Sequence, residues 1–429
     1  MSGSLYLAAQ RLRGGVTPAM IRTASGILNR DPAAMAAYLS ARLRAQFGPE
    51  AGRPGWLAEQ PTVVRTALME LHQAEIATGT RWRREVRRTS GSTGTPFRFV
   101  KSTEMTAWMD ATMWAGYAWH GIRPGDRQLR FWGMPPHGMA RHRRRAIDWV
   151  SDRIRYDAFS QSAVAAKRFL LRAERFRPRY GYGYPTLMAA FAADCTAQGI
   201  DGTSLELKVV ISTGEVLQPA QGELLKAFFG CPIVNEYGCT ESGILAFGCE
   251  HGTSHLLPVA ALAEIVDSEG QGTNPGETGE VVVTDLYGRT LPLLRYRLHD
   301  RAATAPIGTC RCGRSLPGLS IAVGRQDGFI RTPSGREVYD AILAYSVPDS
   351  VQRFRARQTA LARIEVSLVP RPGADPRAMV RDTVAAWEAA LGGEIRVEAT
   401  VVPDLPFDAS GKLRYFLPLQ DECDRTGGG

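Results

Sequence analysis

No stretch of this sequence approaches the roughly 18 consecutive apolar residues of a membrane-spanning helix, so no membrane partner is expected. A secretory signal is also missing, because Arg11 and Arg13 interrupt a short apolar patch and no small-residue cleavage site follows. We therefore expect a cytoplasmic protein. The 44% hydrophobic and 22% charged residues are typical of an ordinary globular protein, and 429 residues allow two or three domains.

Cysteine and lysine are both scarce. The seven cysteines are an odd number, and Cys310 and Cys312 are too close together for an ordinary disulfide framework, which favours thiols or metal ligands. Only five of the 52 basic residues are lysine, so a lysine in a turn is informative.

The net charge of +9 comes without a nucleic-acid-binding signature, so we expect it to attract anionic small molecules rather than nucleic acid.

A loop rich in glycine and hydroxyl groups spans residues 89–96, Thr-Ser-Gly-Ser-Thr-Gly-Thr-Pro. Its free backbone N–H groups and hydroxyls suit a phosphate cradle, whose core is Ser90, Gly91, Ser92, Thr93 and Gly94. A Walker motif is excluded, because Thr95 and Pro96 follow where that motif has lysine and a helix. Residues 97–100 alternate like a strand, which predicts a hairpin-type polyphosphate clamp; a surface turn is the alternative.

The pattern from about residue 160 predicts an α/β fold with a mostly parallel sheet. Helices are expected at 162–176, 186–198 and 220–229, and strands at 205–213 and 232–237. Ligands of such sheets bind at the carboxyl ends of the strands, which here are followed by Gly214 and Glu215 and by Thr240 and Glu241. Glu241 suits a Mg²⁺ ion, Thr240 a phosphate oxygen and Tyr237 a base.

Residues 276–298 predict a β-hairpin system with a turn at Tyr287 and Gly288 and a second strand at 291–298. Asp300 would then stand at a strand end, where it serves either as an acceptor for a ribose diol or as a structural cap. A short polar break at 324–328 separates this part from a small α/β unit. That unit has expected strands at 363–369 and 395–402, a helix at 376–391, and Lys412 on a Ser-Gly turn.

Helices are also expected at 31–47, 61–77 and 103–120, and the last of these carries a stripe of aromatic residues. Such a stripe usually belongs to the core. Its position after the glycine loop makes Trp108 a candidate for one wall of an organic substrate pocket, to which Trp132 and Tyr184 would add.

Cysteine and histidine gather in two loops. Cys249 and His255 in one loop and Cys310 and Cys312 in the other offer the three thiolates and one imidazole of a tetrahedral structural Zn²⁺ site. Spacing does not separate His255 from His251 as the fourth ligand. Reduced thiols that never meet are the alternative interpretation.

In this order, the motifs between Arg81 and Tyr415 resemble the adenylate-forming superfamily of acyl-CoA synthetases, most of all its phenylacetate-CoA ligase branch with its capsule-biosynthesis relatives. The resemblance implies a large adenylation domain at 1–325, with parallel-rich sheets, a barrel-like hairpin subdomain and the zinc staple. It also implies a small mobile lid at 326–429. Some members of this branch have a Cys/His zinc site of the kind described above.

The resemblance assigns roles position by position. It implies that residues 90–94 hold the polyphosphate, that Gly214 and Glu215 flank the adenine with Tyr237 near the base, and that Thr240 contacts the α-phosphate and Glu241 the Mg²⁺. It further implies that Asp300 and Arg325 hold the ribose, that Asp327 is the hinge and that Lys412 bridges nucleotide and carboxylate. Thr95 and His299 depart from the branch, which often has lysine and usually glycine there.

The function implied is ATP-dependent adenylation of a carboxylic acid, followed by transfer to coenzyme A. The aromatic residues of the helix expected at 103–120 suggest an aryl or other flat acid. One alternative keeps the adenylation and changes the acceptor or the acid: amide formation, carrier-protein loading, or activation of nitrite. Another is a non-catalytic, zinc-stapled binding protein. ATP and the acid are the expected partners of a monomer or homodimer.

Overall fold

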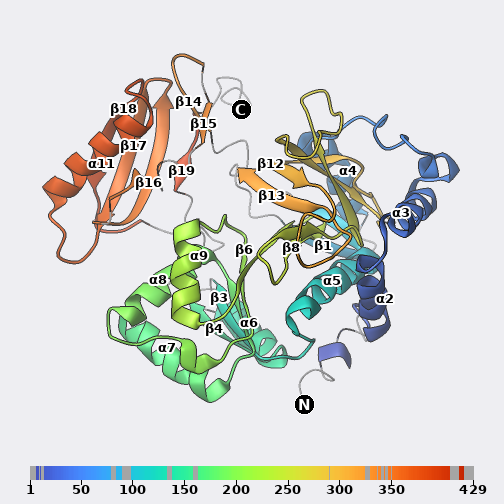
Figure 1. Ribbon diagram of the computed structural model, residues 1–429, viewed down its shortest axis with the longest axis horizontal. Helices are drawn as coiled ribbons and strands as arrows, with labels where there is room; N and C mark the ends of the chain where they lie inside the picture. Colours follow the sequence, from blue (N-terminus) through green and yellow to red (C-terminus); the bar gives the residue numbers. More distant parts are fainter. Residues whose placement is uncertain are drawn as a thin grey trace. The chain divides into compact units, whose positions relative to one another are not determined.

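The computed structural model describes residues 6–8, 10, 14–78, 84–88, 98–132, 138–157, 163–288, 290–323, 329–335, 337–339, 343, 346–348, 350–405 and 415–419. The chain forms two compact units, Met1–Ala322 and Val323–Gly429 (Figure 1). The boundary expected from the sequence lies between Arg325 and Gln326, which are outside the described residues. Among the described helices, none combines the length and apolar character that a membrane crossing requires.

One large sheet runs through the first unit in the strand order β10-β11-β12-β13-β9-β8-β7-β6-β5-β3-β4. Strands β4, β3, β5, β6 and β7 pair in parallel, while β7 pairs antiparallel with β8 and β10 antiparallel with β11. The predicted α/β class is thereby confirmed. The strands are β3 (Gln128–Trp132), β4 (Arg153–Asp157), β5 (Tyr180–Gly183), β6 (Val210–Thr213), β7 (Ile233–Cys239), β8 (Gly243–Gly248), β9 (Ser254–Leu256), β10 (Ala261–Val266), β11 (Gly279–Asp285), β12 (Tyr296–Ala305) and β13 (Gly318–Val323).

Helices cover both faces of the parallel strands (Figure 1). Helices α7 (Ala163–Phe176), α8 (Pro185–Thr196) and α9 (Pro219–Phe229) pack on one face, in a hydrophobic cluster with Phe131 and Val210. Helix α5 (Thr103–Tyr117), which ends in the 3₁₀ turn η2 (Ala118–His120), packs in another cluster with Ile211 and Val234. Because successive residues of a strand face opposite sides, Val210 and Ile211 contribute to different clusters.

The N-terminal elements begin where side chains cap them. Thr17 accepts a hydrogen bond from the Met20 amide at the start of α2 (Pro18–Leu28), and Asp31 accepts one from Ala34 at the start of α3 (Pro32–Phe47). Helix α4 (Arg65–Ala77) starts four residues later than predicted, because Val63 pairs with β12 instead: the Arg297 N–H donates to its carbonyl at 2.9 Å. The remaining elements of this unit are η1 (Pro49–Gly52), β1 (Arg84–Arg88), β2 (Arg98–Ser102), α6 (Gly138–Val150) and η3 (Thr203–Leu205).

Two predicted strands are wrong in their bounds, and left-handed backbone explains both. The strand expected at 205–213 begins only at Val210, because η3 ends in Glu206 with a φ of 49°. The strand expected at 291–298 begins at Tyr296, because Leu291 and Arg295 both have a φ of 45°. Non-glycine residues with such φ values interrupt an extended strand. As a result, Asp300 lies within β12 rather than at a strand end.

The second unit is built on a four-stranded sheet with the order β18-β17-β16-β19. Trp387 of α11 lies fully buried against Phe354, with a ring-centroid distance of 5.1 Å, in a cluster that includes Ile364 and Leu368. The elements are β14 (Phe329–Arg331), β15 (Glu337–Tyr339), β16 (Val351–Ala360), β17 (Arg363–Pro370), α11 (Pro376–Ala390), β18 (Arg396–Val401) and β19 (Phe416–Leu417).

Candidate active site

The carboxyl ends of β6 and β7 lie side by side, because Thr213 and Glu236 are register partners. Gly214 follows β6 with a φ of 75°, a left-handed conformation that favours glycine. On β7, a Cβ at Gly238 would lie 2.2 Å from the Gly243 carbonyl oxygen, so only glycine fits there. These two glycines let both strands end in tight turns that carry Glu215, Thr240 and Glu241.

Tyr237 and Asp300 meet across the sheet. The Tyr237 hydroxyl donates to Asp300 Oδ2 at 2.9 Å, although β13, β9 and β8 stand between β12 and β7 in the strand order. The antiparallel part of the sheet therefore folds back over the carboxyl end of β7. The sequence placed both residues at one site without any signal for this contact.

Glu241 lies in the turn between β7 and β8, with 9% of its surface exposed. The Tyr296 hydroxyl of β12 is 3.5 Å from Glu241 Oε1, and burial together with the Glu241 charge raises the pKa of that tyrosine. Thr240 beside it is exposed. A carboxylate next to an exposed hydroxyl is a set of oxygen donors that fits a partly hydrated Mg²⁺ ion, which retains several waters.

Glu215 contacts the start of α8. Its Oε2 accepts hydrogen bonds from the Thr186 hydroxyl at 2.6 Å and the Thr186 amide at 3.3 Å. A carboxylate at a helix N-terminus satisfies a free amide and interacts favourably with the helix dipole. Glu215 thus fixes the turn after β6 to α8 at the same edge of the sheet.

Glu236 is a functional candidate that the sequence interpretation missed. Its carboxylate accepts hydrogen bonds from the hydroxyls of Tyr117 at 2.6 Å, Thr213 at 3.0 Å and Tyr182 at 3.1 Å. Burial raises its pKa against these hydrogen bonds. A signal was available, because glutamate is out of place in a buried parallel strand whose neighbours are Ile233 and Val234.

The three aromatic pocket candidates fall into two groups. Trp132 stacks on Tyr184 with ring centroids 4.0 Å apart, at the carboxyl ends of β3 and β5, and the Arg130 guanidinium lies 4.8 Å from the Trp132 ring centroid. Trp108 instead stacks on Tyr287 at 4.3 Å, within the hydrophobic cluster around α5. The structure therefore brings Trp132 and Tyr184 together, and it places Trp108 against a different partner.

Four potential metal ligands converge in one place. The ligand atoms of Cys249, His255, Cys310 and Cys312 all lie within 4.8 Å of one another. The Cys249 and Cys310 sulfurs are 3.6 Å apart, and Cys312 Sγ is 3.2 Å from His255 Nε2. The other ring nitrogen, Nδ1, is 3.0 Å from the Leu316 carbonyl oxygen, an outer partner that fixes the ring of a metal-binding histidine.

The structure also separates the two histidines that the spacing could not. His255 belongs to the four-residue group, and His251 does not. The backbone N–H of His251 donates to Cys249 Sγ at 3.4 Å, so His251 helps to orient a ligand by its main chain.

Several predicted site residues lie outside the described residues. These are Ser90, Gly91, Ser92, Thr93 and Gly94 of the glycine loop, Arg325, Asp327 and Lys412. The strands on either side of the loop, β1 and β2, pair antiparallel from Arg84 opposite Ser102 to Arg88 opposite Arg98. The glycine loop therefore connects the two strands of a hairpin.

Known proteins resemble this chain in sequence and in fold. A family model described as AMP-binding enzyme matches residues 88–286. The 4-hydroxybenzoate-CoA/benzoate-CoA ligase of Rhodopseudomonas palustris is 26% identical over 259 residues, which cover 56% of this chain and 47% of that protein. Protein CapK of Staphylococcus aureus is 20% identical over 263 residues, which cover 61% of this chain and 57% of CapK.

Among solved structures, a 2-hydroxyisobutyryl-CoA ligase in its postadenylation state superposes with a TM-score of 0.67 at 17% identity, covering 96% of this chain and 93% of that one. This likeness concerns the fold. The chain spans about half the length of the curated relatives it matches.

Proposed function

We propose that the chain is a member of the adenylate-forming superfamily of AMP-binding enzymes and that it is an AMP-forming ligase. It would activate a carboxylic acid with ATP, release pyrophosphate and pass the acyl group to the thiol of coenzyme A. The observation that carries the proposal is that β12 meets the end of β7 and its following turn at two points, Asp300 at Tyr237 and Tyr296 at Glu241.

The proposed roles follow from the chemistry of these groups. Asp300, half-buried and already accepting a hydrogen bond from Tyr237, would accept those of a ribose diol. The exposed Thr240 hydroxyl would contact a phosphate oxygen, and Glu241 would hold Mg²⁺. A bound Mg²⁺ ion neutralises charge on the phosphate oxygens during the displacement.

Adenylation brings two anions together, the acid carboxylate and the α-phosphate, so the protein must position both and compensate the charge that builds on phosphorus. We assign the backbone and hydroxyls of residues 90–94 to the leaving polyphosphate, and the ammonium group of Lys412 to the bridge between carboxylate and nucleotide. Rotation of the second unit about Asp327 would then withdraw Lys412 and admit the thiol.

For the acid, we propose an aryl carboxylate. Trp132, half-buried at the carboxyl end of β3 and stacked on the buried Tyr184, offers flat apolar surface beside the nucleotide edge. A relative that is named for benzoate and 4-hydroxybenzoate supports the same class.

The test is pyrophosphate release by the purified protein with ATP and Mg²⁺, with hydroxylamine as the trap, across aryl, fatty, amino and inorganic acids. Release should depend on one class of acid and be lost in Lys412→Ala and Glu241→Ala, and addition of coenzyme A should replace hydroxylamine. If coenzyme A fails where an amine or a carrier protein succeeds, the acceptor is different. A complete absence of release with every acid would contradict the ligase.

We also propose that Cys249, His255, Cys310 and Cys312 bind a structural Zn²⁺ ion. Three thiols and one imidazole suit zinc, and with four protein ligands no coordination position stays open for a reaction. Metal analysis of protein purified without added metal should find one zinc per chain. The Cys310→Ser variant should lose it, whereas the His251→Gln variant should keep it.

A further inference from the structure

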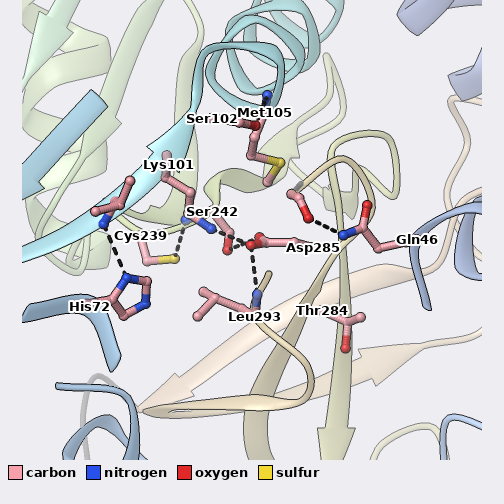
Figure 2. A network of polar contacts seen from close by, with 12 residues as sticks. Gln46, His72, Lys101, Ser102, Met105, Cys239, Ser242, Thr284, Asp285 and Leu293 are labelled. Carbon is pink, nitrogen blue, oxygen red and sulfur yellow. Dashed lines mark hydrogen bonds and ion pairs between the residues drawn. The ribbon is translucent and has the colours of Figure 1, made fainter. Parts of the chain in front are cut away.

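Lys101 and Asp285 form an ion pair in the interior of the first unit, beside Ser242, the residue that follows Glu241 (Figure 2). Their side chains are 2% and 0% exposed, and 184 residues separate them in sequence. Lys101 comes from β2, the strand that follows the glycine loop, and Asp285 ends β11. The pair therefore joins two segments that the sheet order does not bring together.

Asp285 has two further donors. The Ser242 hydroxyl donates to its Oδ1 at 3.0 Å, and the Leu293 amide donates to its Oδ2 at 2.9 Å. Figure 2 shows Lys101 and Ser242 pointing toward the same carboxylate. Ser242 is fully buried and directly follows Glu241, and its own amide donates to Cys239 Sγ at 3.3 Å. We call Lys101, Ser242 and Asp285 the polar hub.

The entry of β2 into this region is fixed as well. The Val100 amide donates to Nδ1 of the buried His72 at 3.2 Å, immediately before Lys101. The hub thus has a defined position at the base of the hairpin that carries the glycine loop. The hub also includes Ser242, the residue that directly follows Glu241 in the turn after β7.

Stability alone does not account for such an arrangement. A buried ion pair must offset the removal of two charges from water, and well-packed apolar residues of similar volume are often as stable or more so. What apolar residues cannot supply is a directional hydrogen bond to the Ser242 hydroxyl. The feature specific to the hub is therefore the orientation that Asp285 gives to the turn.

We infer that Asp285 is a positioning residue that acts through Ser242 to orient the Glu241 carboxylate toward a magnesium–nucleotide complex, while its pairing with Lys101 keeps the glycine-loop hairpin in register with that turn. The inference rests on the proposed function, because it assigns Glu241 to the metal. It adds an outer layer to that site which includes residues from β2 and β11.

The test compares two variants by isothermal titration calorimetry. Ser242→Ala removes the link between Asp285 and the turn, and Lys101→Met combined with Asp285→Leu replaces the pair with apolar side chains. ATP is titrated into protein in saturating Mg²⁺ and into metal-free protein, and the ratio of the two affinities reports how tightly the protein–nucleotide complex holds Mg²⁺. Loss of an outer partner of a metal ligand typically weakens metal affinity by about 10- to 100-fold, so both variants should bind Mg²⁺ at least about tenfold more weakly. Affinity for metal-free ATP should stay unchanged in Ser242→Ala, whereas the double variant, which also frees the hairpin that carries the glycine loop, should bind metal-free ATP more weakly.

Ser40→Ala is the matched control. The Ser40 hydroxyl donates a comparable hydrogen bond at 2.7 Å, but its acceptor is the carbonyl of Gly52, the last residue of η1, which does not belong to the hub. This variant should bind Mg²⁺ like the wild type. Thermal unfolding of each variant shows whether it is folded, and Ser242→Ala decides the matter if the double variant does not fold.

Three outcomes separate the proposals. Weaker Mg²⁺ binding in folded Ser242→Ala, with unchanged binding of metal-free ATP, supports the positioning role. Wild-type Mg²⁺ affinity in folded Ser242→Ala overturns it and leaves the proposed function intact. A wild-type protein that binds no ATP would overturn the proposed function and the hub's role with it.

Discussion

The first unit contains two compact polar clusters that differ in how their members are satisfied. In the polar hub, a cation, an anion, a hydroxyl and a backbone amide satisfy one another within the protein. In the cluster of Cys249, His255, Cys310 and Cys312, four ligand atoms lie within 4.8 Å of one another. Such convergence is typical of residues that share a further partner.

Buried polar groups can therefore serve different ends. A cluster that is complete in itself transmits position from one segment to another, so its variants should change geometry and stability through its own atoms. If the convergent cluster binds the proposed Zn²⁺ ion, its stabilising effect should vanish when the metal is removed. Removal of a metal ligand and loss of the ion pair in the hub should therefore have different consequences.

Loss of the metal ligands should have the largest effect. Cys312→Ser removes one of the four proposed zinc ligands, and the segment that carries Cys310 and Cys312 would lose its attachment to the β8–β9 turn. We expect the melting temperature to fall by about 10 °C or more in differential scanning calorimetry. A chelator should lower the wild-type value similarly and leave the variant unchanged. An equal response of both proteins to the chelator would contradict a zinc staple.

Lys101→Met alone should have the next largest effect, because it leaves the Asp285 carboxylate buried without its cation. Breaking a buried pair in this way costs about 3–5 kcal/mol, which urea unfolding would measure as a lower free energy of unfolding. The Lys101→Met, Asp285→Leu double variant is the control, since it leaves no buried charge unpaired and should recover most of that loss. A double variant as unstable as the single one would mean that packing, not charge, explains the effect.

The sequence predicted the parallel half of the fold, which is confirmed, and the predicted family agrees with the AMP-binding enzyme model that matches residues 88–286. Period-2 and period-3.6 patterns there are local, so helices near 162–176 and 220–229 appear within a few residues of their expected bounds. The antiparallel half was predicted less well. Its strand bounds depend on Leu291 and Arg295, two residues with positive φ whose identities give no such indication.

For the candidate site, spacing brought out residues at strand ends and in turns, and the structure places Tyr237 beside Asp300. The roles of these residues stay predictions. The hub could not be foreseen, because 184 residues separate Lys101 from Asp285 and no local pattern links them. Glu236 was visible as an oddity within a buried strand, yet its three hydroxyl donors come from α5, β5 and β6 and required the fold.

Acid should destabilise the region around the hub through His72. Burial and the nearby Lys101 charge lower the pKa of His72 to about 4, so the folded protein holds the neutral imidazole. The unfolded chain takes up a proton below its ordinary value near 6.5. The contribution of neutral His72 to the free energy of unfolding is therefore complete above about pH 6.5. It declines by roughly 2 to 3 kcal/mol as the pH falls toward 4.

The control for this prediction is His72→Asn, whose side-chain oxygen can still accept from the Val100 amide but does not titrate. Both proteins are unfolded in urea between pH 7.5 and 4.5. Subtracting one free energy of unfolding from the other removes the acid sensitivity that the two proteins share. The difference in their free energies of unfolding should change over this range. A constant difference would show that His72 does not contribute to the acid sensitivity.

The smallest effect is expected at Tyr237, where the polar contact is only half-buried. Tyr237→Phe removes its hydrogen bond to Asp300, but water can reach the carboxylate, so the free energy of unfolding should fall by no more than about 1 kcal/mol. Tyr117→Phe is the matched comparison, because its 2.6 Å hydrogen bond ends on the buried Glu236, which water cannot reach as easily. That variant should lose about 1–3 kcal/mol. Equal losses would mean that burial does not distinguish the two carboxylates, and Asp300 would then be a structural acceptor rather than one available to a ribose.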